Sequence, residues 1–192
     1  MVKIYDMKTT TALFLLFITN LAFGQYGDDD LENANWKIGQ EMNIFGNTIV
    51  RLEGKNITLG MLNVGYKTLS QLLAEVELMA EREMWLNEKK EDKKSFYEKY
   101  AGGGIIYLYL TRYLEGAADM KQFTVIVRDS TDINEIYRKE LDSEYPILSI
   151  NNEYWWNSTM VFTPNQTKGN IFIYVIDKLG GDNNKFKFEV KL

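Results

Sequence analysis

Two neighbouring tryptophans give the clearest clue to a binding surface. Residues 154–163 are rich in β-prone side chains, and consecutive side chains of a strand point to opposite faces, so Trp155 and Trp156 must separate. The row that contains Trp156 and Met160 is the more apolar of the two. We therefore expect that row to face the core and Trp155 to face outward, where its indole ring can bind a ligand.

A second aromatic row occurs in residues 105–113, where alternation separates an apolar row from a tyrosine row. The expected inward residues are Ile106, Leu108 and Leu110, and the expected outward residues are Tyr107, Tyr109 and Tyr113. Outward aromatic rings on a sheet can stack on sugar rings or receive a protein partner. Trp155 and the three tyrosines are therefore the predicted ligand-binding residues. The alternative is that a long helix covers the tyrosines.

Acidic side chains gather near two predicted turns. Asp129 and Asp132 follow one predicted strand, and Asp177 and Asp182 follow another. Carboxylates in loops at one end of a sandwich can bind Ca²⁺, although their spacing here does not match an EF-hand and aspartate also favours turns for backbone reasons. Calcium binding by these four residues is left open, and no metal or cofactor is predicted.

Paired carboxylates offer a second kind of chemistry. Glycoside hydrolysis needs two carboxyl groups on either side of a sugar and requires neither histidine nor cysteine. Nothing in the spacing of the acidic residues places two of them opposite each other. A carboxylate-dependent glycoside hydrolase or related secreted hydrolase is therefore the alternative function.

Three consecutive glycines, residues 102–104, resemble a phosphate-binding loop only superficially. Such a loop needs a Lys-Ser/Thr pair and a following helix, whereas Ile105-Ile106-Tyr107 follows here. We expect these glycines to end a helix and to lead into a strand.

The residue inventory narrows the possible chemistry further. The chain contains no histidine and no cysteine, which excludes imidazole bases, thiolate nucleophiles, Cys/His zinc sites and disulfides. Hydrophobic residues make up 45% of the 192 residues, which is typical of a folded domain. The net charge of −5, without a basic cluster, argues against binding to nucleic acid.

An export signal precedes the folded part. Residues 12–18 form an uninterrupted apolar run that is preceded by lysine and followed by the small-x-small pattern of residues 22–24. We expect a signal peptide over residues 1–24, of a short bacterial type, with Met7 as an alternative start. The run is too short to span a membrane, so cleavage would leave no stable membrane anchor. The mature chain would begin at Gln25 in the periplasm or outside the cell.

The segments that must position these residues begin with a loose leader and a hairpin. Residues 25–35 are polar and acidic, so we expect them to be a flexible leader before one domain over residues 36–192. A hairpin is predicted within residues 36–60. Its strands would be residues 48–52 and 56–59, joined at Gly54.

The clearest single element is an amphipathic helix. Thr68 is a plausible N-cap, and apolar residues then recur at helical spacing: Leu69, Leu72, Leu73, Val76, Met79 and Ala80. The helix either continues over residues 68–100 or breaks near Asn87 into two helices. We expect its apolar stripe to pack against the sheet.

The part from residue 104 to residue 192 reads as β-structure. Strict alternation of Phe186, Phe188 and Val190 with charged residues predicts a half-buried strand. Further strands are predicted over residues 105–113, 123–127, 154–163 and 171–176, and residues 133–141 fit either an edge strand or a helix.

The sequence therefore predicts one α+β domain with an antiparallel, β-sandwich-like C-terminal half. The missing catalytic side chains and the surplus of aromatic residues favour an exported, non-enzymatic module that binds a glycan or a protein partner. Binding would use a sheet face or the end loops. The oligomeric state does not follow from the sequence.

Overall fold

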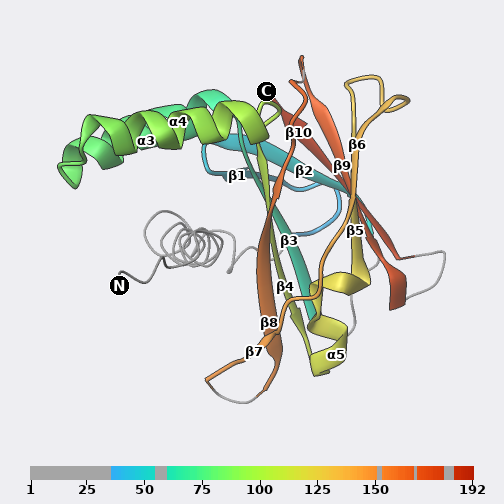
Figure 1. The fold of residues 1–192 in the computed structure, drawn as a ribbon. Coiled ribbons are helices and arrows are strands. Elements are labelled where there is room, and N and C mark those ends of the chain that lie inside the picture. Colours follow the sequence, from blue (N-terminus) through green and yellow to red (C-terminus); the bar gives the residue numbers. More distant parts are fainter. Residues whose placement is uncertain (1–35, 55–59, 151–152, 167, 180–183) are drawn as a thin grey trace, which may run out of the picture.

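Two antiparallel sheets pack face to face and form the body of the molecule (Figure 1). The computed structural model describes residues 36–54, 60–150, 153–166, 168–179 and 184–192. Sheet A contains, in spatial order, β1 (Glu41–Ile44), β2 (Asn47–Glu53), β10 (Lys185–Lys191), β9 (Ile171–Asp177), β5 (Phe123–Arg128) and β6 (Glu135–Glu140). Sheet B contains β3 (Gly60–Lys67), β4 (Ile105–Arg112), β8 (Trp155–Phe162) and β7 (Ile147–Leu148).

The predicted α+β, sandwich-like fold is confirmed. Each strand expected beyond residue 104 is present, and residues 135–140, within the ambiguous segment, form the edge strand β6. The short helix α5 (Glu115–Ala118) and the 3₁₀ helix η1 (Met120–Gln122) connect β4 of sheet B to β5 of sheet A.

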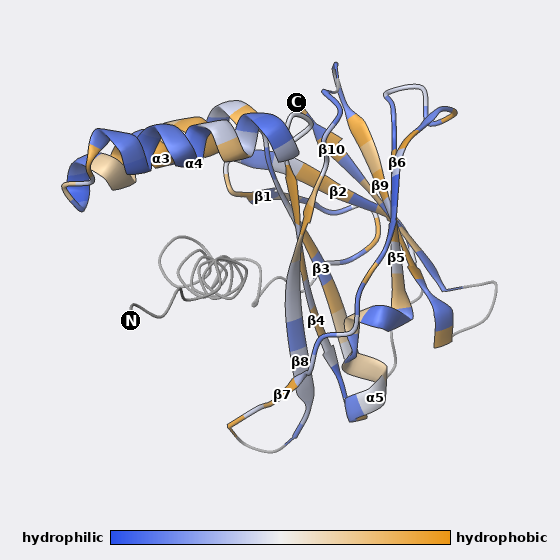
Figure 2. Ribbon diagram, viewed as in Figure 1, coloured by the Kyte–Doolittle hydropathy of each residue, from blue (hydrophilic) through white to orange (hydrophobic). Residues whose placement is uncertain are grey.

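Alternating side chains of the two sheets form one core. Ile106, Leu108 and Leu110 are buried on the face of β4 that also carries Arg112, whose guanidinium reaches Asp177 of sheet A. The inward row predicted for this strand is therefore correct. From sheet A the core receives Phe123, Val125, Ile173, Val175, Phe186 and Phe188. Figure 2 shows that strands of both sheets carry apolar residues.

The N-terminal hairpin differs from the predicted one. β1 and β2 form it, and Phe45 and Gly46 make the turn, both with positive φ (55° and 82°). A two-residue turn of this kind requires positive φ at both positions. Phenylalanine is an unusual residue there, so the turn was not predictable from the residue types. The expected second strand, residues 56–59, lies outside the described residues.

β3 was not expected from the sequence. Every residue from position 62 to position 67 is buried, because β3 is covered on both faces and pairs with β4 along its whole length. A strand buried on both faces lacks the alternation of apolar and polar residues that reveals a half-buried strand.

Two helices lie between β3 and β4 in the chain, as in the second of the two predicted alternatives. α3 (Leu69–Arg82) starts at the predicted N-cap Thr68, which forms a capping box with Gln71. The helix ends before Met84, whose φ is 52°, and α4 (Asn87–Tyr100) follows. We call this pair of helices the helical arm.

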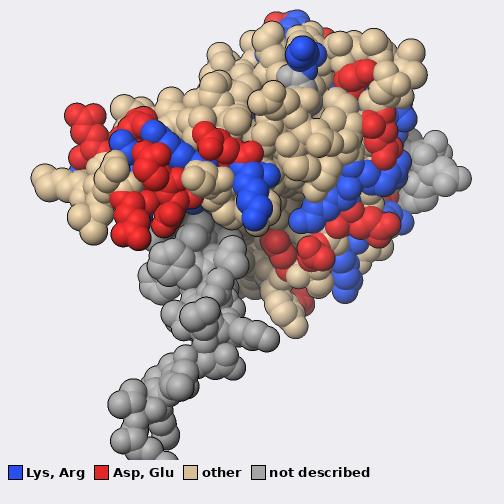
Figure 3. All heavy atoms as spheres, turned by 45° about the horizontal axis from the view of Figure 1, so that its top comes forward, with Lys and Arg blue, Asp and Glu red and all other residues tan. Residues whose placement is uncertain are grey.

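The helical arm projects from one end of the sandwich (Figure 1). Of the predicted stripe, Leu72, Val76 and Ala80 are buried, and α3 packs against α4. No residue of α4 is fully buried. Its Tyr97 is half-buried, and this partial loss of contact with water raises the pKa of the Tyr97 hydroxyl to about 12. Figure 3 shows basic and acidic side chains interspersed over the arm.

The glycines of residues 102–104 connect α4 to β4, as predicted. The Gly103 amide donates to the Thr163 carbonyl at 2.7 Å, and a Cβ atom at Gly103 would lie 2.0 Å from the Asn165 carbonyl oxygen. The close approach of two backbone segments therefore requires glycine at this position.

Residues 1–35 lie outside the described residues, so the signal peptide and the leader remain predictions. From residue 36 onward, the described helices are too short or too polar to cross a membrane.

Candidate functional site

Tyr107 and Tyr109 lie on the outer face of sheet B, as alternation predicts, but both are buried. The ring of Phe45, from the β1–β2 turn, packs edge-on against Tyr107 with 4.9 Å between centroids. Tyr109 stacks on Trp156 at 6.0 Å. Phe45, rather than the expected helix, therefore covers Tyr107, and neither tyrosine ring offers an open platform to a sugar.

The predicted orientation of the two tryptophans is wrong. Trp155 lies opposite Arg112 and therefore on the face of sheet B that meets sheet A. Asn157 shares that face, is buried, and donates to the Ala118 carbonyl at 3.1 Å. Trp156 lies on the outer face, where it meets Tyr109.

The physical reason is that polar side chains of β8 have inward partners. Asn157 also donates to the Glu144 carbonyl at 3.0 Å, and the Thr159 hydroxyl donates to the Glu144 carboxylate at 3.0 Å. Buried polar groups are stable when they are hydrogen-bonded. These partners are 13 to 39 residues away along the chain, so comparing the hydrophobicity of the two rows could not reveal them.

The four predicted site residues do not form one site. Tyr107 and Tyr109 are buried on the outer face, Trp155 is half-buried on the inner face, and Tyr113 lies beyond the end of β4. Tyr113 is 57% exposed and belongs to a different set of side chains.

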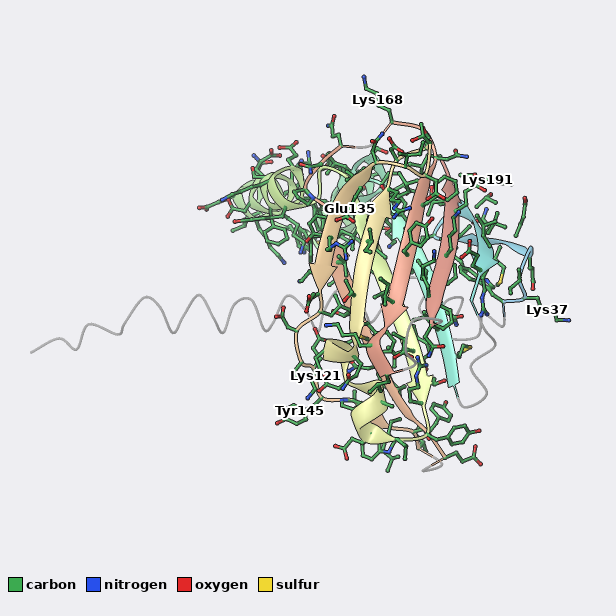
Figure 4. All side chains as sticks on the ribbon, turned by 90° about the vertical axis from the view of Figure 1, so that its right-hand side faces the viewer. Lys37, Lys121, Glu135, Tyr145, Lys168 and Lys191 are labelled. Carbon is green, nitrogen blue, oxygen red and sulfur yellow. The ribbon has the colours of Figure 1, made fainter. Side chains whose placement is uncertain are left out.

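A group of exposed apolar side chains, which includes Tyr113, lies at the end of sheet B that carries β7. The register places Trp155 between Arg112 and Leu148, so the residues after β4 and those around β7 lie at one end of the sheet. We call the exposed large side chains there the lower apolar end: Tyr113, Leu114, Tyr145, Ile147, Leu148 and Ile150. This end is at the bottom of Figure 1, and Figure 4 shows Tyr145 pointing away from the body.

Tyr113 is the one residue of this set that was predicted from the sequence as a ligand-binding residue. The available signal was the apolar residues among positions 145–150. Pro146 and Ser149 interrupt them and leave only the pair Ile147-Leu148, which is shorter than a normal strand. Only the strand register shows that this pair lies beside the residues after β4.

Asp119 holds the chain segment that leads to β7. Its carboxylate accepts hydrogen bonds from the Ser143 hydroxyl at 2.8 Å and the Glu144 amide at 3.2 Å, and it pairs with the Lys121 ammonium at 3.0 Å. Burial alone would raise the pKa of Asp119, but the bonds from Ser143 and Lys121 dominate and lower it to about 2.

Ser149 closes the turn between β7 and β8. Its amide donates to the Tyr154 carbonyl, and its hydroxyl accepts from the amides of Glu153 and Tyr154. The backbone next to the exposed Ile150 is therefore anchored on both sides of the turn.

Glu144 and Asp119 are the acidic pair that best fits the alternative of a hydrolase. Burial raises the pKa of Glu144, which accepts a hydrogen bond from Thr159, while Asp119 stays ionised. Such a difference between two carboxyl groups is typical of acid catalysis. The Asp119 carboxylate is already occupied by Ser143, Glu144 and Lys121. These contacts join the segment after α5 to the segment before β7, so we assign Asp119 a structural role.

The suggested calcium ligands do not meet. Asp129 follows β5, whereas Asp177 lies opposite Phe123 at the start of β5, so the two aspartates lie at opposite ends of sheet A. Asp132 accepts from Lys187 and from the Tyr174 hydroxyl, both at 2.6 Å, and Asp177 pairs with Arg112 at 3.1 Å.

A shared calcium site is therefore not formed by the three described aspartates, because Asp177 lies at the opposite end of sheet A from Asp129 and Asp132, and Asp182 lies outside the described residues. Among the described residues no group of three acidic side chains could hold a metal ion. Hydrogen bonds from Thr131 and Asn134 lower the pKa of Asp129 to about 2.

The outer face of sheet A, which Figure 4 shows, carries cations and anions in pairs. Lys187 pairs with Asp132 at 2.6 Å, Arg138 pairs with Glu135 at 2.6 Å, and Lys191 pairs with Glu41. Paired charges of this kind are typical of a solvated face.

A comparison with protein-family models and with curated protein sequences finds no match to this chain.

Proposed function

We propose that this chain is an exported, non-enzymatic module that binds a protein partner through the lower apolar end. The observation that carries the proposal is the collection of six exposed large apolar side chains at one end of sheet B, on a backbone anchored by Asp119 and Ser149. Exposed apolar clusters on an ordered scaffold mark interaction sites.

A protein partner suits this surface better than a glycan. Four of the six side chains, Leu114, Ile147, Leu148 and Ile150, are aliphatic, and aliphatic groups pack against apolar side chains rather than stacking on sugar rings. The aromatic row that could have stacked on sugars, Tyr107 and Tyr109, is buried.

The tip of the helical arm also exposes apolar side chains, but their surroundings differ. Met84 and Leu86 lie beside Arg82 and Glu83, which form an ion pair at 3.0 Å, and α4 begins there with a run of charged residues. The tip therefore serves as a control surface of similar exposure.

The test compares two double variants of the mature protein. Leu114→Ser with Ile150→Ser changes the lower apolar end, and Met84→Ser with Leu86→Ser changes the tip of the arm. Both pairs are exposed, so thermal melting should be nearly unchanged. We expect the first variant to capture at least about tenfold less of the proteins that wild type retains from the exported fraction, and the second to capture them normally.

Equal capture by wild type and the Leu114/Ile150 variant would contradict the proposal. Retention of immobilised glycans, or release of sugars from them, would favour the glycan-binding or hydrolase alternatives instead.

Export is tested separately by the intact mass of the protein recovered from the exported fraction. We expect the mass of a chain that begins at Gln25.

A further inference from the structure

The backbone groups of β8 point alternately toward β4 and away from it. The Thr163 amide donates to the Gly104 carbonyl, so odd-numbered residues face β4. The Tyr154 carbonyl accepts from Ser149, on the opposite side, so even-numbered residues face away. Every second amide and carbonyl of β8 is therefore available to another neighbour.

β7 is too short to use that side of β8. It consists of two residues, and its register ends where Ile147 lies opposite Trp156. The Ser158 amide is satisfied by the side chain of Asn157. Beyond it, no strand of the described chain lies beside Met160 and Phe162. We call residues 158–162 on this side the open edge of β8, which faces the viewer in Figure 1.

Two other edge strands, β6 of sheet A and β3 of sheet B, are protected. β6 carries four charged residues among six, with an ion pair between Arg138 and Glu135. The free edge of β3 is covered at the Tyr66 carbonyl, which accepts from the Asn47 side chain at 2.7 Å. Charged or covered edges prevent pairing with another chain. Residues 158–162 contain no charged side chain and no proline.

We propose that the open edge of β8 binds an extended polypeptide segment of the protein partner, which adds a strand to sheet B beyond β7. Amides and carbonyls that recur at every second residue are matched by one kind of ligand, an extended backbone with the same repeat. The pairing is antiparallel, as it is in every strand pair of the described residues. This inference rests on the proposed protein-binding function.

The side chains along the edge indicate what kind of segment it accepts. Met160 and Phe162 lie on the outer face, and Thr159 and Val161 lie on the inner face. None of the four side chains is charged. On the inner face the Glu144 carboxylate accepts a hydrogen bond from Thr159, so an added segment of uncharged, β-branched residues brings no second carboxylate beside it. Such a strand would end beside β7, whose Ile147 belongs to the lower apolar end.

The probe is a six-residue peptide of alternating threonine and valine with blocked ends, N-methylated at every second residue. Methylation removes the donors from one edge of the peptide, which prevents its self-association, and leaves the other edge free to pair. A peptide methylated at every residue is the control. The readout is the backbone amide spectrum of the mature wild-type protein.

We expect the half-methylated peptide to shift the amide resonances of Met160 and Phe162 and to slow their hydrogen exchange. The fully methylated peptide should have no effect. In Met160→Pro, which removes a donor of the open edge without touching the ladder to β4, the affinity should fall about tenfold. Arg138→Pro, which removes the corresponding outward donor of β6, should leave the affinity unchanged.

Three results would overturn the inference: slow exchange of the Met160 and Phe162 amides without peptide, equal binding by both peptides, or no binding of the half-methylated peptide to wild type. If Met160→Pro does not fold, the comparison of the two peptides on wild type decides alone. If the peptide test gives one of these results but the Leu114/Ile150 variant loses capture of the partner, then the strand-addition inference is wrong and the proposed protein-binding function is still supported.

Discussion

At the scale of single residues, buried polar side chains determine how the lower apolar end is held. Asp119 joins the segment after α5 to the segment before β7, although 24 residues separate it from Ser143. Its carboxylate is ionised in the folded protein, with a pKa of about 2. An unfolded aspartate has a pKa of about 3.9, so ionisation of Asp119 is coupled to folding.

Asp119→Asn should therefore destabilise the protein in a pH-dependent manner. The folded pKa lies below the unfolded one, so the stabilisation is complete above about pH 4 and is lost as the pH falls toward 2. We expect a loss of about 1–3 kcal/mol at neutral pH that shrinks below pH 4, measured by thermal melting. Asp142→Asn, at an exposed side chain, is the control and should show no loss.

The orientation of β8 can be tested at two adjacent residues. Val161 is fully buried on the inner face, whereas Met160 is half-buried on the outer face. Val161→Asp should cost more than about 3 kcal/mol, because it buries an unpaired charge, and Met160→Asp should cost clearly less. Urea unfolding measures both, and the reverse order would mean that the register of β8 is shifted by one residue.

At the scale of elements, the connections determine how strands and helices meet. The helical arm enters and leaves sheet B at one end, between Lys67 and Ile105, which lie opposite each other on β3 and β4. Tight backbone contacts at residues 102–104 hold this junction. Phe96 of α4 adds an edge-to-face contact with Phe162 at 5.6 Å.

Two glycine substitutions should have opposite effects. Gly103→Ala places a Cβ atom 2.0 Å from the Asn165 carbonyl oxygen, so the junction must shift and the melting temperature should fall by several degrees. Gly116→Ala, in α5, meets nothing within 4 Å and should stabilise the protein by about 0.5–1 kcal/mol. An unchanged melting temperature in Gly103→Ala would show that the two segments do not pack as closely as described.

At the scale of the whole molecule, the two sheets are joined by a shared apolar core and by the buried ion pair of Arg112 and Asp177. Arg112 of sheet B and Asp177 of sheet A are 5% and 4% exposed. Burial lowers the pKa of Arg112, and the neighbouring Asp177 opposes that shift. Removing one partner of such a pair leaves the other charge buried and unpaired.

Arg112→Met should therefore cost about 3–5 kcal/mol in the free energy of unfolding. Adding Asp177→Asn removes the orphaned charge and keeps an oxygen for the Leu179 amide, so the double variant should recover much of the loss. Urea unfolding of the single and double variants checks this. Two losses that simply add would show that the two side chains act independently.

The sequence by itself determined the elements whose signals are local. Alternation identified β10, a run of apolar residues identified β9, helical spacing after the N-cap Thr68 identified α3, and the glycines of residues 102–104 marked the entry to β4. These signals depend on neighbours within a few residues, because side-chain periodicity and capping are properties of short segments.

Only the tertiary structure decided which faces are buried and which residues form the candidate site. Trp155 faces inward because Asn157, on the same row, bonds to a carbonyl 39 positions away, and β3 is hidden because it is covered on both faces. The lower apolar end and the open edge of β8 exist because β7 pairs with only two residues of β8. Such pairings join residues far apart in the chain, and local periodicity carries no record of them.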